Sequence, residues 1–351
     1  MQFTRRGTVI NPYPLGKLPP EHLARLFERY PAQNARVVIG PGIGHDAAVI
    51  DVCGAGSGSS SHYLAVKSDP ITFATDEVGW YAVHVNANDI ACTGATPRWF
   101  LATLLLPQSR TDEILVDRIF AQVTQACRQL NIVLVGGHTE ITYGIDRPIV
   151  AGFMLGEMER RALVRPDGAR PGDILLLTKG IAVEGTAIIA REKRSDIGEV
   201  APSLIERSRK FLSDPGISVV RDAAVATAAG DVHAMHDPTD GGLSTGLHEM
   251  AAAAGVGLTV DEPAIPVFGE TAALCDLLDL DPLGLIASGA LLLAVAPDDA
   301  APISRALEAE GIASACIGQV VEREYGLILR SAGAERPLPR FEQDEIAKLF
   351  E

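Results

Sequence analysis

Acidic residues follow apolar runs or glycines at several points along this chain of 351 residues. Taken singly, each is an ordinary choice for a turn or a helix N-cap. Taken together, polar residues that end buried strands can reach a common cleft, which is where ligands bind in α/β folds. The pattern therefore favours alternating strands and helices around a polar cleft. The residues concerned are Asp46, Asp69, His138, Glu140, Asp237 and Asp240.

Apolar periodicity predicts the elements of the first half of the chain. Asp76 and Thr111 are the expected N-caps of its second and third helices, and Gly94 ends the second. The Gly/Ser-rich run that starts at Cys53 is typical of a flexible hairpin loop. We expect helices at 21–30, 80–92 and 112–130 and strands at 47–52, 63–67, 133–135 and 149–155.

Turn-forming residues are dense in 165–173, which predicts a domain boundary there. The expected domains are 1–165 and 166–351. Helices and strands also alternate in the second half, so the predicted fold class is α/β (mixed α+β) in two domains. The expected strands are 174–178, 257–260, 289–295, 315–320 and 327–329, and the expected helices are 182–192, 203–212, 218–229, 243–254, 270–279 and 299–310.

Charge and composition exclude several classes of protein. A net charge of −15 disfavours nucleic acid and anionic membranes as partners, whereas acidic motifs can hold a divalent metal. The longest apolar run, 290–296, is far shorter than the roughly 20 residues that cross a bilayer, and no signal peptide is evident, so we predict a cytoplasmic protein. The 5 cysteines lack a Cys-x-x-Cys pair, so we expect them to be reduced and mostly buried.

The helix expected at 80–92 contains Asn86-Ala-Asn-Asp89, three weak helix formers in an apolar segment. Asn86 and Asp89 are three residues apart and share one face of that helix. They are either a buried hydrogen-bonded pair or, if they face the cleft, ligands of the kind that suits hydrated magnesium.

No Walker A pattern and no kinase glycine-rich loop with its lysine is present, so a nucleotide site must be of another kind. The segment from Asp237 through Gly241 and Gly242 is either a phosphate cradle at a helix N-terminus or a plain helix start. His-Glu-x-x-His and Cys/His zinc patterns are also missing.

Four segments in order, 42–50, 85–97, 136–140 and 236–243, resemble those of the AIR-synthase-like (PurM-like) superfamily of ATP-dependent enzymes. The superfamily includes aminoimidazole ribonucleotide synthetase, thiamine-monophosphate kinase, selenophosphate synthetase and the hydrogenase-maturation protein HypE. The resemblance implies an N-terminal α/β domain that dimerises through its sheet, a C-terminal α/β domain, and ATP with Mg²⁺ in the cleft.

Residue by residue, the resemblance implies the following site. The metal ligands would be Asp46, Asp69, Asp89 and Asp240, and the catalytic residues Asp89, Asn86 and Glu140. The nucleotide would contact Asp46, Lys67, Asp69, Gly136, Gly137, His138, Arg165, Asp237, Thr239, Asp240 and Gly241. His45 and His138 stand where family members carry aspartate, which predicts that one metal site is weakened or replaced.

Within the superfamily the C-terminal half most resembles HypE, which uses ATP to dehydrate a carbamoylated cysteine at its own C-terminus. The last cysteine here is Cys316, inside a predicted strand, so we do not expect that chemistry in cis. Residues 95–104 resemble the thiamine-monophosphate kinases instead, but 287–291 replaces their usual Gly-Glu-Asp-Tyr-Glu.

The leading hypothesis is an ATP- and Mg²⁺-dependent enzyme that moves the γ-phosphate to an oxygen of a small-molecule acceptor, as a kinase or in a phosphate-activated dehydration or ligation. The alternatives are a non-catalytic nucleotide-binding or maturation-partner protein, a thiamine-monophosphate kinase, and a metal-dependent hydrolase. We also expect a homodimer, because the strands at 47–52 and 63–68 would otherwise expose apolar edges.

Overall fold

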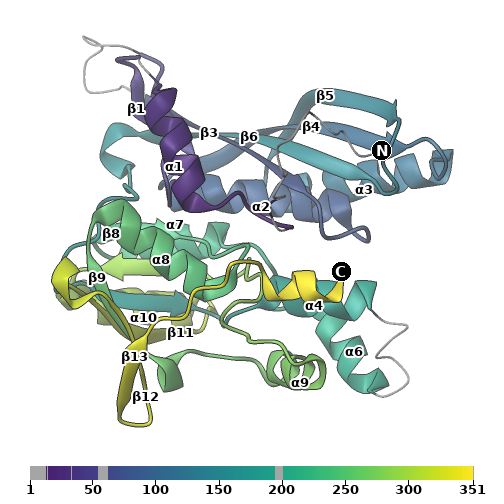
Figure 1. Ribbon diagram of the computed structural model, residues 1–351. Coiled ribbons are helices and arrows are strands. Elements are labelled where there is room, and N and C mark those ends of the chain that lie inside the picture. The colour runs from purple at the N-terminus through teal and green to yellow at the C-terminus, as the bar shows by residue number, and fades with distance from the viewer. Residues whose placement is uncertain (1–12, 14, 33, 54–61, 194–200, 351) are drawn as a thin grey trace, which may run out of the picture.

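The computed structural model describes residues 13, 15–32, 34–53, 62–193 and 201–350. Apart from Cys53, the predicted Gly/Ser-rich hairpin loop lies outside these residues. The chain forms two β-sheets with their helices, one from each half, packed on each other (Figure 1). The sheets are connected between Glu159 and Ile174, the stretch that contains the predicted boundary.

The N-terminal sheet has 6 strands in the order β1-β2-β3-β6-β4-β5. Its pairs are antiparallel except β4–β5, which are parallel because α3 carries the chain across between them. The strands are β1 (Val37–Ile39), β2 (Ala48–Asp51), β3 (His62–Ile71), β4 (Thr96–Pro107), β5 (Val133–Thr142) and β6 (Ile149–Glu159).

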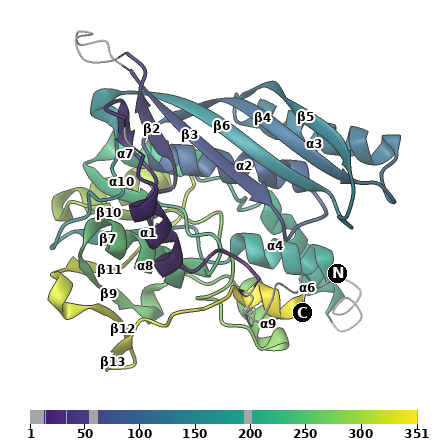
Figure 2. The same ribbon diagram turned by 45° about the horizontal axis from the view of Figure 1, so that its top comes forward.

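Two helices, α2 (Val78–Cys92) and α3 (Glu113–Gln129), cover the face of this sheet that is turned toward the C-terminal half (Figures 1 and 2). Nearly every side chain of α2 is buried, because the sheet lies on one side of it and the C-terminal half on the other. The short helix α1 (Pro20–Arg29) begins on the side of α8 and ends beside β1.

The C-terminal sheet has 7 strands in the order β13-β12-β9-β11-β7-β10-β8. Its interior strand β7 is buried on both faces: Leu175 and Leu177 pack on the side of α8, and Leu176 packs on the side of α7 and α10. The strands are β7 (Ile174–Thr178), β8 (Val232–His236), β9 (Gly257–Asp261), β10 (Leu292–Val295), β11 (Ser314–Val321), β12 (Leu327–Ser331) and β13 (Ala334–Pro337).

The remaining helices either flank this sheet or pack beside it against α2. The apolar core that includes α2 continues into α4 and α6, so the two halves share buried side chains. The helices are α4 (Val183–Glu192), α6 (Pro202–Ser208), α7 (Val220–Ala229), α8 (Gly242–Ala254), α9 (Gly269–Leu278) and α10 (Pro297–Ala309). No described helix is long and apolar enough to cross a membrane.

Several local expectations are corrected. Asp76 does not cap α2; it lies 2.7 Å from Arg191, and Glu77 occupies the cap position without a side-chain bond. Thr111 does not cap α3, whose first turn is capped by Asp112 through the amide of Leu115. Strands β1, β4, β8 and β13 were not expected, and β5 is longer than predicted. The mixed α/β fold with two sheets is confirmed.

Candidate functional site

Carboxylates from four separate parts of the chain converge around Lys67 at the junction of the two halves. The Lys67 ammonium group lies 3.2 Å from Asp89 Oδ1 and 3.5 Å from Asp69 Oδ2. Burial alone would lower the pKa of Lys67, but Asp89 and Asp69, with Asp46 and Asp237 farther away, raise it above its usual value. Lys67 is therefore a fixed cation in an acidic cluster.

Local structure explains this convergence. Lys67 and Asp69 are two residues apart on β3, so both side chains leave the same face of the strand as the buried Ala65 and Ile71. Asp89 belongs to α2, which packs on that face. Asp237 directly follows β8, and Asp46 precedes β2.

The deepest carboxylates have oxygens without a donor among the described residues, namely Asp89 Oδ2 and Asp237 Oδ2. Burial raises the pKa of Asp89 well above its usual value, since Lys67 offsets the effect only in part, and burial together with Asp46 raises the pKa of Asp237 to about 7. Orphaned carboxylate oxygens of this kind suit a divalent cation such as Mg²⁺, which prefers oxygen ligands.

One thiol also belongs to this cluster. Potential ligand atoms of Asp46, Cys92 and Asp237 all lie within 4.8 Å of one another. Burial raises the pKa of the Cys92 thiol well above its usual value, and its Sγ lies 3.6 Å from Asp237 Oδ1, so the thiol donates to that carboxylate. Cys92, Cys127 and Cys275 are buried, Cys53 and Cys316 are exposed, and all are free, as expected.

A buried histidine links the two halves beside the cluster. His236 Nδ1 lies 2.7 Å from Asp46 Oδ1, and its Nε2 lies 2.9 Å from Glu249 Oε2 on α8. Burial alone would lower the pKa of His236, but the two carboxylates raise it well above its usual value. Despite burial, Lys17 and His236 lower the pKa of Glu249 to about 2. The three side chains form an Asp46–His236–Glu249 ion bridge.

Lys17, from the segment before α1, reaches across the start of α8. Its ammonium donates to Thr239 Oγ1 at 3.2 Å and lies 3.7 Å from Glu249 Oε1. Gly16 is adjacent to the carboxylate of Asp240, whose pKa is raised by burial although Lys17 opposes the shift. The predicted residues Thr239 and Asp240 thus lie next to a cation that the sequence did not indicate.

Asn86 and Asn88 of α2 act as clamps, meaning that each side chain both donates to and accepts from the backbone of a neighbouring segment. Asn86 Oδ1 accepts the amide of Asp69 at 2.9 Å, and its Nδ2 donates to the carbonyls of Asp69 and Ala82. Asn88 Nδ2 donates to the carbonyl of Ile217, and its Oδ1 accepts the amide of Val219, both at 2.8 Å. Asn86 therefore positions β3 at the cluster, while Asp89 pairs with Lys67, so the two side chains have different partners.

The start of α8 is already occupied by the chain itself. Gly241 and Gly242 have φ of 82° and 66°, a backbone that favours glycine. The Gly241 amide donates to Asp344 Oδ2 at 2.6 Å, and the Gly242 amide donates to the Thr239 carbonyl at 2.9 Å. A carboxylate from the C-terminal segment thus accepts the Gly241 amide that a phosphate cradle, one of the two alternatives for this segment, would use.

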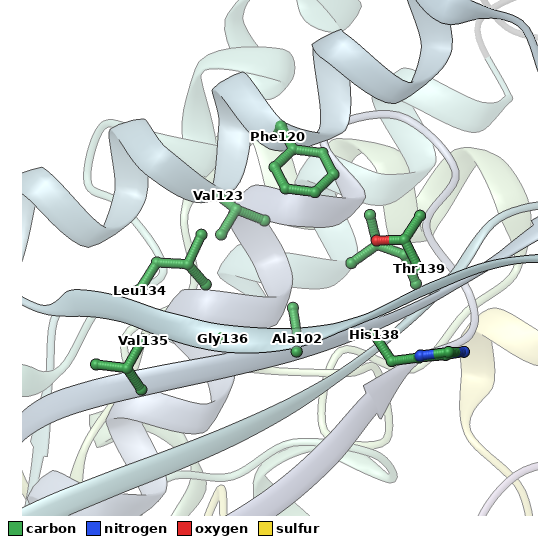
Figure 3. Close-up of a pocket in the computed structure, with 10 residues that line it drawn as sticks. Ala102, Phe120, Val123, Leu134, Val135, Gly136, His138 and Thr139 are labelled. Atoms are coloured by element: carbon green, nitrogen blue, oxygen red, sulfur yellow. The ribbon is translucent and has the colours of Figure 1, made fainter.

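Other predicted residues lie apart from the cluster. Glu140 and His138 are exposed on β5, with β6 and β4 between them and β3, and they pair with each other at 3.2 Å. Gly136, Gly137 and His138 line a different cavity of about 380 Å³, between α3 and the strands β4 and β5 (Figure 3).

The walls of that cavity are largely apolar, and Phe120 and Val135 stand at its exposed side.

Arg165 and His45, two further residues discussed in the sequence analysis, bond neighbours in their own segments of the chain. Arg165 is half-exposed and bonds Asp167 through Nε and Nη2, which lowers the pKa of that carboxyl. His45 bonds the carbonyl of Gly40 at 2.8 Å, so it supports the turn before Asp46.

The chain matches two halves of one family. Residues 44–158 match the N-terminal domain of AIR synthase related protein, and residues 170–330 match its C-terminal domain. Carbamoyl dehydratase HypE of Rhizobium leguminosarum bv. viciae is 30% identical over 258 residues, which cover 72% of this chain and 70% of that protein. The chain belongs to the AIR synthase-related family.

Solved structures of this family share the architecture. HypE in complex with ATP superposes with a TM-score of 0.69 at 27% identity, covering 81% of this chain and 86% of that chain. At lower identity, the fold alone is shared with thiamine monophosphate kinase from Aquifex aeolicus (TM-score 0.66, 19% identity, 90% and 98% covered) and with a chain of a HypE–HypF complex (TM-score 0.72, 20%, 91% and 98%). The family resemblance read from the four motifs is confirmed.

Proposed function

We propose that this protein binds ATP with Mg²⁺ at the Lys67 cluster and transfers the γ-phosphate to an oxygen of a small acceptor. The supporting observation is the set of buried carboxylates with orphaned oxygens around one fixed lysine. Asp46, Asp89 and Asp237 would hold the metal, with the more exposed Asp69 and Asp240 nearby. When bound, Mg²⁺ would neutralise charge on the phosphate oxygens.

The residues of the chain would act by placement and charge. Lys67 is held in position by two carboxylates and lies ready to neutralise a phosphate oxygen. Asn86 fixes the backbone of β3 at Asp69, so the positions of Lys67 and Asp69 depend on α2. Burial of Asp89 and Asp237 keeps water from screening these charges, which strengthens every electrostatic interaction in the site.

Calorimetric titration with ATP and MgCl₂ tests this proposal. The wild type should bind ATP only when Mg²⁺ is present, and Asp89→Asn should weaken binding about tenfold or more, equivalent to about 1.4 kcal/mol. Asp117→Asn, an exposed acid on α3, is the matched control and should bind normally. Absence of binding by the wild type, or normal binding by Asp89→Asn, would refute the proposal.

A second candidate is nucleotide binding without turnover, as in a maturation-partner protein. It is favoured by the start of α8, where Asp344 takes the Gly241 amide that a phosphate would use. ATP binding with no phosphate released or transferred across a broad acceptor screen would favour this candidate over the enzyme. A cytoplasmic location and a partner protein stay predictions.

A homodimer is proposed from the outer face of the N-terminal sheet, which no described helix covers. Trp99, Val133 and Phe153 expose 37%, 58% and 41% of their surface there. Trp99 pairs with Val133 across β4 and β5, so the two side chains share that face. A second copy of the chain would bury this apolar surface.

A further inference from the structure

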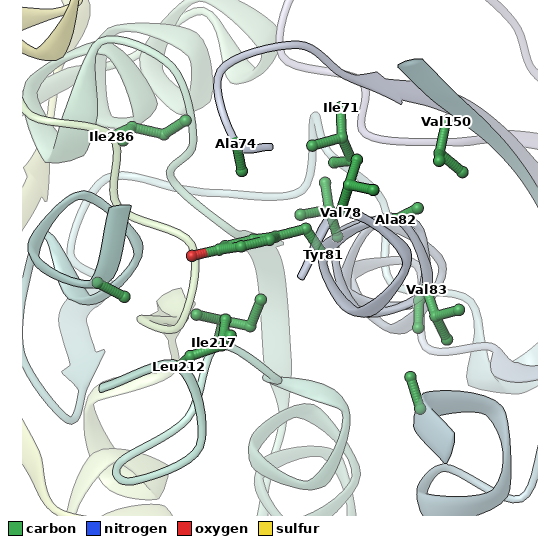
Figure 4. Close-up of a cluster of buried hydrophobic side chains, with 14 of the residues drawn as sticks. Ile71, Ala74, Val78, Tyr81, Ala82, Val83, Val150, Leu212, Ile217 and Ile286 are labelled. Atoms are coloured by element: carbon green, nitrogen blue, oxygen red, sulfur yellow. The ribbon is translucent and has the colours of Figure 1, made fainter. Parts of the chain in front are cut away.

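The C-terminal end of α2 meets the other half of the molecule through polar groups, unlike its start. Near the start the contact is apolar: Figure 4 shows the ring of Tyr81 beside Leu212 and Ile217, all members of one buried core. Cys92, the last residue of α2, instead places its Sγ 3.6 Å from Oδ1 of Asp237, the residue that follows β8. A thiol buried against a carboxylate is an environment that apolar packing alone does not explain.

Three side chains from separate segments bring possible metal ligands together at this place. One ligand atom each from Asp46, Cys92 and Asp237 lie within 4.8 Å of one another. Zinc bonds of about 2.3 Å to sulfur and about 2.0 Å to oxygen, at a tetrahedral angle, place the two ligand atoms about 3.5 Å apart. The 3.6 Å between Cys92 Sγ and Asp237 Oδ1 therefore already matches a tetrahedral zinc ion, and the Asp46 oxygen is close enough to complete the set by a side-chain rotation.

Asp237 independently indicates that a cation belongs here. Its side chain is only 1% exposed, and no described donor reaches its Oδ2. The Cys92 thiol is a weak donor and serves the other oxygen, Oδ1. A buried carboxylate oxygen without a donor costs free energy unless a cation or another polar group contacts it. The carboxylate of Asp237 is therefore incomplete in the free protein.

Asp46 is held in place from outside the group of three. Nδ1 of His236 lies 2.7 Å from Asp46 Oδ1, and Nε2 of the same ring lies 2.9 Å from Glu249 Oε2. Carboxylates that bind metal ions are themselves oriented by outer partners of this kind, and those partners contribute to metal affinity. The Glu249–His236–Asp46 chain therefore supplies the outer support that a metal ligand needs.

The thiol decides which cation suits these ligands. Mg²⁺ takes oxygen ligands, whereas thiolate sulfur selects softer ions such as Zn²⁺. We propose that Asp46, Cys92 and Asp237 form a Zn²⁺ site, and that Zn²⁺ bound there displaces Mg²⁺. On binding, the S–H bond of Cys92 breaks, a sulfur–zinc bond forms, and the proton passes to solvent. The site stands apart from the proposed function, but the displacement rests on it, because both ions would use Asp46 and Asp237.

Co²⁺ tests the site, because it substitutes for Zn²⁺ and its bond to a thiolate gives a charge-transfer absorption band in the near ultraviolet. The wild type should show this band, and added Zn²⁺ should remove it. Cys92→Ser should lack the band, whereas Cys127→Ser, which changes a buried cysteine in the apolar core of α3, should keep it. Cys53→Ser/Cys316→Ser removes the exposed thiols and should also keep it. A wild type or double variant without the band, or a band that survives in Cys92→Ser, would overturn the inference.

Competition with a chelating dye measures the affinity for Zn²⁺. Loss of an outer partner of a metal ligand costs about 10–100-fold in metal affinity, so Cys92→Ser, which removes a ligand, should weaken Zn²⁺ binding at least about tenfold. An unchanged affinity would overturn the site, and Mg²⁺ that fails to weaken Zn²⁺ binding by the wild type would overturn the displacement. Circular dichroism establishes that Cys92→Ser folds. ATP binding by the wild type with Mg²⁺ and no Zn²⁺ is measured separately, and its absence refutes the proposed function while the cobalt band still decides the zinc site.

Discussion

Replacing His236 with glutamine should weaken the contact between the two halves of the molecule. His236 bridges Asp46 of the N-terminal half and Glu249 of α8, and all three side chains are largely buried. Lowering the pKa of Glu249 from 4.5 to about 2 corresponds to about 3 kcal/mol in favour of its ionised form, shared between Lys17 and His236. Removing one member of a buried ion pair costs about 3–5 kcal/mol.

These figures predict that His236→Gln lowers the free energy of unfolding by about 3 kcal/mol. With an unfolding entropy of about 2.1 cal/mol/K per residue, such a loss lowers the Tm of a chain of 351 residues by about 4 °C. The variant keeps a hydrogen-bonding side chain of similar size, so the loss reports mainly the missing positive charge.

The loss of stability in His236→Gln should change with pH in a direction that the two pKa shifts determine. The pKa of His236 is raised in the folded protein, so its stabilisation is complete below about pH 6.5 and disappears as pH rises through the folded value. The pKa of Glu249 is lowered, so its stabilisation is present above about pH 4.5 and disappears as pH falls toward 2. The difference in Tm between wild type and variant should therefore be largest near pH 6.

Thermal unfolding followed by circular dichroism between pH 5 and 10 measures this difference. His248→Gln on α8 is the control, because the pKa of His248 is lowered by burial and no carboxylate pairs with it among the described residues. The reasoning is refuted if His236→Gln loses less than about 1 °C at pH 6, or if the difference stays constant as pH rises to 10.

Three further substitutions test other contacts. Asn88→Ala removes two buried bonds between α2 and residues 217–219 and should cost about 2–4 kcal/mol in urea unfolding; a loss below about 1 kcal/mol would contradict the clamp. Trp99→Lys should give a monomer in sedimentation velocity, while Ile114→Lys on the exposed face of α3 should not, and a monomeric wild type would exclude the dimer. Asp344→Ala leaves the amides of Gly241 and Ile286 without their acceptor and should cost about 2–3 kcal/mol in urea unfolding, and an unchanged midpoint would show that they need no acceptor.

Most helices were predictable because their apolar spacing is a local property of the chain. The apolar period of α8 and its stop at Gly255 are visible in the sequence, and both are found. Strand β4 was missed because Gly94 followed by Pro97 is typical of the end of a helix. Thr96, Pro97 and the residues up to Pro107 nevertheless form a 12-residue strand. Pro97 lies near the strand start, where a missing amide is tolerated.

The candidate site was predictable only in part. Asp69, Asp89 and Asp237 could be found because each carboxylate stands at the end of an element or inside an apolar helix. Burying a carboxylate there costs free energy, which indicates that it serves a purpose. Lys17 and Glu249 could not be found, since they meet across more than 200 residues and each is unremarkable in its own segment. His138 and Glu140 fit a family motif, yet the sheet order places them on the edge strand β5, with β6 and β4 between them and β3.

Helix α2 makes contacts in different directions from neighbouring residues: Asn86 bonds β3, Asn88 bonds residues 217–219, and Asp89 pairs with Lys67. One residue inserted before Asn86 would rotate everything after it by about 100° around the helix axis and break all of these contacts together. Natural variation in length among related chains should therefore fall in the connections and spare α2. The spacing within this helix is then a stricter marker of shared ancestry than the identity of any single residue in it.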